Sequence, residues 1–502
     1  MGCLNDQQVM QTNGRPKRRV IQSTNVDIRK NYEFISILGN GAFGKVRLYR
    51  DKNYKALLFA IKTLKKEGIP PYQFSLLKSE VTILSNLDHP NIVKYFGTFE
   101  DEHYIHIVME YLKGHDLTKI ISLKKYTGFD EKDMCKIIQQ LLKALSFIHS
   151  KNIVHRDIKP ENILFSNKRD YTTLRLIDFG LATSGNKDKK SVGTPYYMSP
   201  EMINGESCPK SDIWSVGVIV YLMLTEKYPF NSTEDSNLFD VIKKQSYDIT
   251  PLEESECSDE AKDFIDKCLK KRIENRMSTS EALKHPWISK FCTKNDTNLL
   301  NTDTIGTLLD FANKSALQKE IYYFIAKVSK ESDIVKIKQF FNSLDTTNSG
   351  TLTLEKIGTA FKKMGIKISE NDLKLIYDGL DFHRDGHINY SEFLAAMISS
   401  YNFEKEEKLW SVFNLFKENK KNKNYITFDS MNKAVKALNL NIDETEMRKC
   451  FSKFDQEINF EDFKKLILEG EEEDRNYKET FKDEKDILVR YSSRNVMKHK
   501  TQ

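Results

Sequence analysis

The sequence has few of the features that mark secreted, metal-scaffolded or membrane-spanning proteins. Its seven cysteines are scattered and form no C-x-x-C pair, which argues against a disulfide framework or a zinc site and fits a reducing compartment. The longest apolar run, WSVGVIVYLML from Trp214, has 11 residues and is too short to span a bilayer. No secretory signal peptide is recognisable at the N-terminus. We therefore expect a globular cytoplasmic protein.

Neither sign of charge is in large excess. The net charge is +6 over 502 residues, a balance too mild to indicate nucleic-acid binding, so no nucleic-acid partner is expected. The length allows two to four domains.

The first residues, 1–31, form an extension with signals for lipid attachment. Gly2 and Cys3 are candidates for myristoylation and palmitoylation, although Asp6 replaces the usual Ser or Thr of the motif. The basic stretch GRPKRR follows, and a second signal of this kind makes single-chain anchoring stable. Membrane association and an ordinary polar tail therefore both remain open.

The C-terminal third repeats itself. Loops beginning at Asp345 and Asp381 are 36 residues apart, and similar segments begin at Asn419 and Asp455. A period of this length indicates stacked supersecondary units. We expect four helix–loop–helix units in two pairs, followed by a tail: residues 332–367, 368–403, 406–441, 442–476 and 477–502.

The second loop, DFHRDGHINYSE, has most of the ligands of an EF-hand calcium site. Such a loop places oxygen ligands at positions 1, 3, 5, 7, 9 and 12, with glycine at position 6. The candidate calcium ligands are Asp381, Asp385, His387 through its backbone carbonyl, Asn389 and Glu392. His383 stands at position 3, and we expect it to swing aside and leave that position to water.

The other three loops lack key ligands. In the first loop Lys356 replaces the bidentate Glu of position 12, and Glu355 is one residue early. The third offers Lys421 and Lys423 at ligand positions, and the fourth is about four residues short after Asp455. These units are expected to be structural, with one calcium site in the second loop.

The N-terminal part opens with a glycine-rich motif, G-x-G-x-x-G-x-V. Dinucleotide-binding folds use a similar string to open a helix. Here Val46 and Leu48 alternate with Arg47 and Tyr49, which predicts a strand and thus a hairpin over phosphates. The candidate nucleotide-binding residues of the hairpin are Leu38, Gly39, Asn40, Gly41, Ala42, Phe43, Gly44, Lys45 and Val46.

Two charged residues follow in a fixed order. Lys62 ends FAIK on an alternating segment, and Glu80 lies in a segment with apolar residues at helical spacing. A strand lysine paired to a helical glutamate can hold the α- and β-phosphates of ATP.

Three further motifs appear in order: HRDIKPEN, DFG and GTPYYMSPE. With the hairpin and Lys62 they make residues 32–288 resemble the eukaryotic protein kinase family, with Ser199 in place of the usual alanine. The resemblance implies Asp157 as the base that orients the substrate hydroxyl, Lys159 at the γ-phosphate, and Asn162 and Asp178 as magnesium ligands. Lysine at 159 and the GT pair resemble the Ser/Thr kinases.

The same resemblance assigns residues around the nucleotide and the substrate. Met109 is similar to the gatekeeper, Glu110 and Leu112 to the hinge that meets adenine, and Asp116 to the ribose contact. Glu161 is placed to read basic residues upstream of the target Ser or Thr.

Other residues have structural roles in the resemblance. It implies a buried Glu201–Arg276 ion pair and an Asp212 that bonds backbone near the catalytic loop. Lys190 stands where many kinases carry a phosphorylated threonine facing Arg156, so phosphorylation of the activation segment is not expected to be obligatory; Asp188 or a phosphorylated Ser191 could substitute for it.

A kinase domain, a joining segment and four EF-hand units together resemble the calcium-dependent protein kinases of plants and protists. The implied fold is α+β: a two-lobed kinase, an autoinhibitory junction at 289–331 and an all-α EF-hand domain. The implied cofactors are ATP, Mg²⁺ and Ca²⁺, with an intramolecular contact between kinase and EF-hand domain. A calcium-indifferent EF-hand domain and a calcium-binding pseudokinase scaffold are the alternatives.

Overall fold

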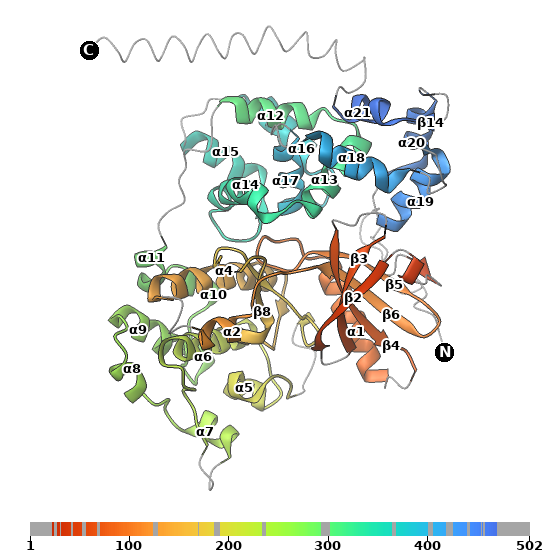
Figure 1. The fold of residues 1–502 in the computed structure, drawn as a ribbon. Coiled ribbons are helices and arrows are strands. Elements are labelled where there is room, and N and C mark those ends of the chain that lie inside the picture. Colours follow the sequence, from red (N-terminus) through yellow and green to blue (C-terminus); the bar gives the residue numbers. More distant parts are fainter. Residues whose placement is uncertain are drawn as a thin grey trace, which may run out of the picture.

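The structure is a computed structural model, and it has two parts that lie one above the other (Figure 1). The described residues are 23–24, 28–30, 32–41, 44–52, 57–67, 71–123, 129–168, 170–184, 191–232, 237–292, 302–363, 368–399, 405–417, 425–438, 442–452, 454 and 457–468. Within these ranges no helix is long and apolar enough to cross a bilayer.

The N-terminal lobe is a six-stranded sheet with the order β1-β5-β6-β4-β3-β2. Only β1, which pairs with β5, is parallel to its neighbour. Helix α1, Pro71–Ser85, lies beside this sheet. The strands are β1 Ser23–Thr24, β2 Tyr32–Gly41, β3 Gly44–Asp51, β4 Leu58–Lys65, β5 Tyr95–Glu100 and β6 Tyr104–Glu110.

The second lobe is mainly helical and surrounds α4 and α6, which bury most of their apolar side chains. Its helices are α2 Leu117–Ser122, α4 Glu131–Ser150, α5 Pro200–Ile203, α6 Pro209–Thr225, α7 Leu238–Lys244, α8 Thr250–Glu254, α9 Asp259–Cys268, α10 Thr279–Leu283 and α11 Pro286–Phe291. Two short antiparallel pairs, β7–β10 and β8–β9, carry the catalytic segments: β7 Ile153–Val154, β8 Ile163–Phe165, β9 Leu174–Leu176 and β10 Thr183–Ser184.

The C-terminal part is a helical domain with its own apolar core, which extends from Leu308 to Ile467. Its elements are α12 Thr302–Ala312, α13 Ala316–Val328, α14 Glu331–Leu344, β11 Thr351–Leu352, α15 Leu354–Lys363, α16 Glu370–Leu380, β12 Ile388–Asn389, α17 Tyr390–Ile398, α18 Lys405–Phe416, β13 Ile426–Thr427, α19 Phe428–Leu438, α20 Glu444–Phe451, β14 Glu457–Ile458 and α21 Phe460–Leu468. The loops meet in pairs, because β11 bonds to β12 and β13 to β14. The expected fold class, α+β kinase lobes followed by an all-helical EF-hand region, is confirmed.

The predicted junction is part of this helical domain. Ser315 begins α13 with a capping box that includes Gln318, and Gln318 donates to the carbonyls of Leu466 and Ile467 in α21. Leu308, Phe311, Leu317 and Ile321 of α12 and α13 are buried in the domain core. The junction therefore holds the two ends of the helical domain together.

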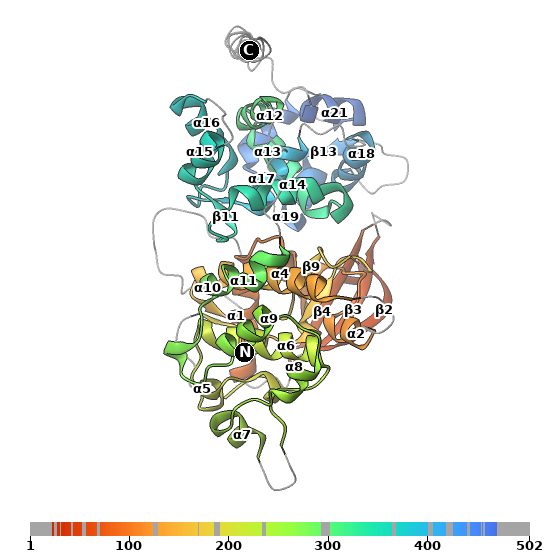
Figure 2. The same ribbon diagram turned by 90° about the vertical axis from the view of Figure 1, so that its left-hand side faces the viewer.

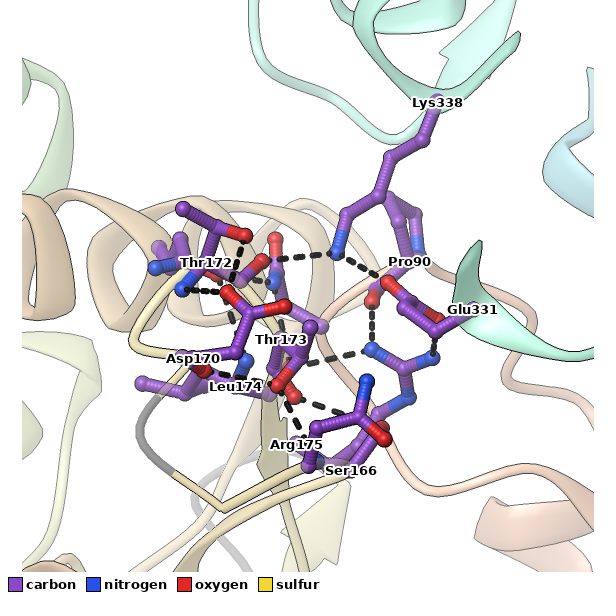
Figure 3. Close-up of polar contacts among 12 residues, drawn as sticks. Pro90, Ser166, Asp170, Thr172, Thr173, Leu174, Arg175, Glu331 and Lys338 are labelled. Carbon is purple, nitrogen blue, oxygen red and sulfur yellow. Dashed lines mark hydrogen bonds and ion pairs between the residues drawn. The ribbon is translucent and has the colours of Figure 1, made fainter. Parts of the chain in front are cut away.

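A buried charge network joins the helical domain to the kinase lobes (Figure 3). Arg175 of β9 donates to Glu331 at 2.6 Å, to the Pro90 carbonyl at 2.7 Å and to Glu110 at 3.0 Å. Lys338 donates to the other oxygen of Glu331 at 3.0 Å and to the Thr172 carbonyl at 3.2 Å. Burial opposes ionisation of Glu331, but Arg175, Lys338 and Lys94 outweigh it and hold its pKa well below the usual value.

Two further contacts extend this interface. Lys94 donates to the Lys327 carbonyl at 3.1 Å, and Ser391 of α17 donates through its amide and its hydroxyl to the Asp88 carboxylate at 3.1 and 2.8 Å. Segments far apart in the sequence thus form one docking face. Figures 1 and 2 both place α14 and α17 over the side of the kinase that carries α4, and Figure 2 shows β9 on the same side.

Removing the charge of Glu331 is expected to weaken this interface. Glu331→Gln leaves Lys338 buried without its carboxylate, and breaking a buried ion pair on one side costs about 3 kcal/mol. Urea unfolding of the full chain measures the loss. Glu370→Gln, an exposed position in the first turn of α16, is the control and should change stability little. Equal stability of the two variants would contradict a structural role for the network.

Candidate active site and calcium loops

The lysine expected to bind the ATP phosphates, Lys62, is held between two carboxylates. Lys62 of β4 donates to Glu80 of α1 at 2.6 Å and to Asp178 at 3.1 Å. Burial alone would lower the pKa of Lys62, but Glu80 and Asp178 outweigh it and raise the pKa. The pairing of strand lysine with helical glutamate, predicted from order alone, is confirmed.

The glycine-rich motif is a β2–β3 hairpin with Gly41 opposite Gly44, and it opens no helix. A Cβ on Gly44 would lie 2.3 Å from the Thr63 carbonyl oxygen, so only glycine fits this approach to β4. Leu38, Lys45 and Val46 lie on the two strands. Ala42 and Phe43 lie outside the described residues.

The catalytic carboxylate of Asp157 is surrounded by polar partners. Lys159 lies 2.8 Å away, and Thr194 donates to Asp157 at 2.7 Å while accepting from Lys159 at 2.9 Å. Asn162 donates its amide nitrogen to Asp157 at 3.1 Å, which leaves the amide oxygen, the atom magnesium prefers. Sequence reasoning missed Thr194 as a site residue; its place in the GT pair was the available signal.

Two residues at the site have left-handed backbone. Arg156 and Asp178 have φ values of +69° and +56°, which non-glycine residues rarely adopt. Asp212, as predicted, supports the turn by accepting the amides of His155 and Arg156, each at 3.0 Å. Burial would raise the pKa of Asp178, yet Lys62 holds it below its usual value. The Asp178 carboxylate, the expected magnesium ligand, is therefore kept ionised.

The hinge residues lie at and beyond the end of β6. The Glu110 carboxylate accepts from the Lys94 amide at 2.8 Å and from Arg175, so this side chain serves the interface behind the hinge. The Leu112 side chain is buried. Asp116 caps α2 by accepting from the Lys119 amide at 2.8 Å. The backbone contacts of Glu110 and Leu112 to adenine, the gatekeeper role of Met109 and the ribose contact of Asp116 stay predictions.

The activation segment is fixed at its C-terminal end. Arg276 binds Glu201 through two hydrogen bonds of 2.6 and 3.0 Å, which confirms the predicted buried ion pair. Ser191 is exposed. Asp188 and Lys190 lie outside the described residues, so the expectation that phosphorylation is not obligatory stays a prediction.

The second EF-hand loop corrects one expectation. His383 does not swing aside: it bonds to Glu392 at 2.7 Å and lies 3.1 Å from Glu320 of α13. Burial would lower the pKa of His383, but Glu320 and Glu392 outweigh it and raise the pKa to about 9. Burial raises the pKa of Glu392 to about 7. A protonated His383 therefore pairs with the Glu392 carboxylate at position 12. The loop sequence alone does not reveal this pair, because the second acid, Glu320, comes from the junction.

The remaining calcium candidates have backbone partners. Asp381 accepts the amides of Asp385 and Gly386, Asp385 accepts the amide of His387, and Asn389 and Glu392 cap each other. In the described part of the chain, no three His, Cys, Asp or Glu side chains converge as a metal site. The donors fit calcium in type and loop position, but Glu392 must first leave His383, so this ligand set stays a prediction. Lys421, Lys423 and Asp455 lie outside the described residues.

The comparisons agree with this architecture. The Protein kinase domain model matches residues 32–288, and the EF-hand domain pair model matches residues 334–398. Calcium-dependent protein kinase 34 of Arabidopsis thaliana is 31% identical over 453 residues, covering 88% of this chain and 85% of that protein. Calcium-dependent protein kinase 3 of Plasmodium yoelii yoelii is 35% identical over 387 residues, covering 76% of this chain and 70% of that protein.

The fold and the site thus define a protein kinase joined to an EF-hand region. The chain belongs to the calcium-dependent protein kinase family. It is a calcium-regulated serine/threonine kinase that acts on protein substrates; ATP and Mg²⁺ are the cofactors of its kinase domain, and Ca²⁺ is the ion that its EF-hand region implies.

Loss of the Asp157 carboxylate should remove turnover and spare nucleotide binding. Asp157→Asn keeps the shape of the side chain but cannot accept the substrate proton, so kcat should fall by a factor on the order of 10²–10⁴. ATP affinity, measured by calorimetry, should change little. Asp259→Asn, an exposed aspartate at the start of α9, is the matched control. Turnover in Asp157→Asn close to that of the control would reject the assignment.

Proposed function

We propose that Asp157, Lys159 and Lys62 transfer phosphate from ATP to protein Ser or Thr, and that the second EF-hand loop regulates this activity. The observation that supports this proposal most directly is the polar cluster that places Lys159 and Thr194 against the Asp157 carboxylate. When bound, magnesium–ATP supplies the phosphoryl group and the cation that offsets its charge.

The chain's own groups orient the reaction. Asp157 accepts the proton of the substrate hydroxyl, and Thr194 and Lys159 hold its carboxylate in place. Lys62, fixed by Glu80, binds the α- and β-phosphates, while Asn162 and Asp178 provide oxygen ligands for magnesium. This intact set disfavours a pseudokinase scaffold.

The calcium response is assigned to Asp381, Asp385, His387, Asn389 and Glu392. Calcium at this loop would neutralise carboxylates that His383 now partly neutralises. Glu392 directly follows Ser391, which bonds to Asp88 of the kinase. Reorienting Glu392 therefore acts on the Ser391–Asp88 contact. Calcium binding is proposed to expose apolar surface on the helices around the loop, and this surface would capture the segment near residues 305–342 and release it from the kinase cleft.

A second candidate is a kinase with a calcium-indifferent helical domain. The contact of His383 with Glu392 and Glu320 favours it, because the loop already contains a cationic group. Calcium dependence separates the two candidates.

Glu392→Gln should abolish the calcium response if the second loop carries it. In the wild type, a single calcium site should give graded activation with a Hill coefficient near 1. Because this site lacks the usual oxygen ligand at position 3, its Kd for calcium should be on the order of 10⁻⁵ M. Kinase activity titrated against buffered calcium, beside calorimetry, measures both. Glu355→Gln, exposed and adjacent to position 12 of the first loop, is the control. Calcium-independent wild-type activity without binding heat would favour the second candidate.

Substrates are proposed to carry Arg or Lys upstream of the phosphorylated residue. Glu161 is exposed beside the catalytic loop, and Asp116 adds a second carboxylate. Since an exposed ion pair contributes up to about 1 kcal/mol, Glu161→Gln should reduce the preference for basic peptides up to about fivefold. Peptide arrays measure this, with Glu253→Gln of α8 as an exposed control. An unchanged profile would assign Glu161 to loop support only.

Membrane association through Gly2 and Cys3 is also a proposal. These residues lie outside the described part of the chain, and its support is the MGC start with the basic stretch that follows. Localisation in the cytoplasm, anchored or free, is proposed on the same grounds.

A further inference from the structure

The first EF-hand loop contains an ammonium group where calcium would lie. Lys356 contacts Asp345 Oδ1 at 2.8 Å, Ser349 Oγ at 2.5 Å and the Thr351 carbonyl at 2.7 Å. These three oxygens belong to positions 1, 5 and 7 of the loop, which are the calcium-ligand positions of an EF-hand. Lys356 itself stands at position 12, from which the missing glutamate would reach the same point.

The same loop lies against the kinase. Gly350, at position 6, has φ of +71°, and a Cβ there would come within 2.6 Å of side-chain atoms of both His89 and Phe147. These two rings stack with a centroid distance of 5.1 Å. Gly386, the equivalent residue of the second loop, has φ of +84° and no atom within 4 Å of its Cβ position. Of the first and second loops, which are both fully described, the first alone uses its glycine turn to contact another domain.

The segments around the loop belong to the docking face as well. Helix α14 carries Glu331 and Lys338 and ends at Leu344, directly before Asp345, the first residue of the loop. Asp345 also accepts the amides of Ser349 and Gly350 at 3.1 and 2.6 Å. The shape of the loop, and the position of the Gly350 turn, therefore depend on how the charge of Asp345 is balanced.

We propose that Lys356 is a built-in substitute for the calcium ion, and that the loop it holds closed is a calcium-independent docking surface for the His89–Phe147 face of the kinase lobe. The ammonium satisfies the oxygens that would otherwise repel one another or attract an ion. Because it is tethered, this half of the interface persists when calcium is removed. The inference does not depend on whether the second loop binds calcium.

The first test removes the tethered charge. In full-length Lys356→Met with chelator present, amide hydrogen exchange in residues 345–352 and 86–94 should become at least tenfold faster than in wild type. Exchange in Lys356→Met equal to wild type in both segments would overturn the proposal.

The second test restores the usual carboxylate. Lys356→Glu in a Glu392→Gln background should bind one calcium ion that the Glu392→Gln parent does not bind, as counted by calorimetry. Its two segments should exchange fast in chelator and regain protection with calcium. If no calcium site is added, the proposal that the Lys356 ammonium takes the place of calcium is overturned. The result does not depend on the second loop, because both proteins carry Glu392→Gln.

A matched pair of glycine substitutions tests the second part of the proposal, the docking of the first loop on the kinase. Gly350→Ala and Gly386→Ala introduce the same Cβ at positive φ, but only the first meets His89 and Phe147. In chelator, Gly350→Ala should raise exchange in residues 86–94 at least tenfold, and Gly386→Ala should leave it unchanged. Equal effects of the two variants would overturn docking through the first loop.

Discussion

The guanidinium of Arg175 is the constraint on which the arrangement of the two parts depends. It is fully buried and satisfies acids from both parts, Glu110 at the kinase hinge and Glu331 at the start of α14. A buried charge of this kind is tolerated only when it is paired, and Glu331 of the helical domain supplies a second carboxylate beside Glu110 of the kinase lobes. The same carboxylate of Glu110 also accepts a hydrogen bond from the Lys94 amide, which connects the interface to the start of β5, the neighbour of the strand that ends at the hinge.

Internal cations recur where this family implies ions. Lys62 neutralises Glu80 and Asp178, Lys356 occupies the first loop, and His383 faces Glu392 in the second. In each place a cationic side chain lies within 3.1 Å of at least one carboxylate oxygen. At Asp178 this contact keeps the expected magnesium ligand ionised, whereas at the first loop the ammonium of Lys356 contacts oxygens at calcium-ligand positions.

Much of the catalytic site could be predicted from sequence because its residues lie in ordered motifs. The pairing of Lys62 with Glu80 follows from the order of the motifs, whereas the Glu201–Arg276 pair and the backbone role of Asp212 were implied by the resemblance to protein kinases. The interface between the helical domain and the kinase lobes could not be predicted, because Arg175 and Glu331 belong to no recognised motif and meet only through tertiary packing. His383 was wrongly expected to turn outward since its second partner, Glu320, belongs to the junction helix. Lys356 was correctly excluded as a ligand, but sequence did not reveal that its ammonium enters the loop.

The central claim is that the Arg175–Glu331 pair joins the helical domain to the kinase lobes. A double-mutant cycle of Arg175→Met and Glu331→Gln, measured by urea unfolding of the full chain, tests it most directly. Residues in one buried network are coupled by up to about 3 kcal/mol, so the double variant should be clearly more stable than the sum of the single losses predicts. Additivity within about 0.5 kcal/mol would show that the two residues act independently and would contradict the account.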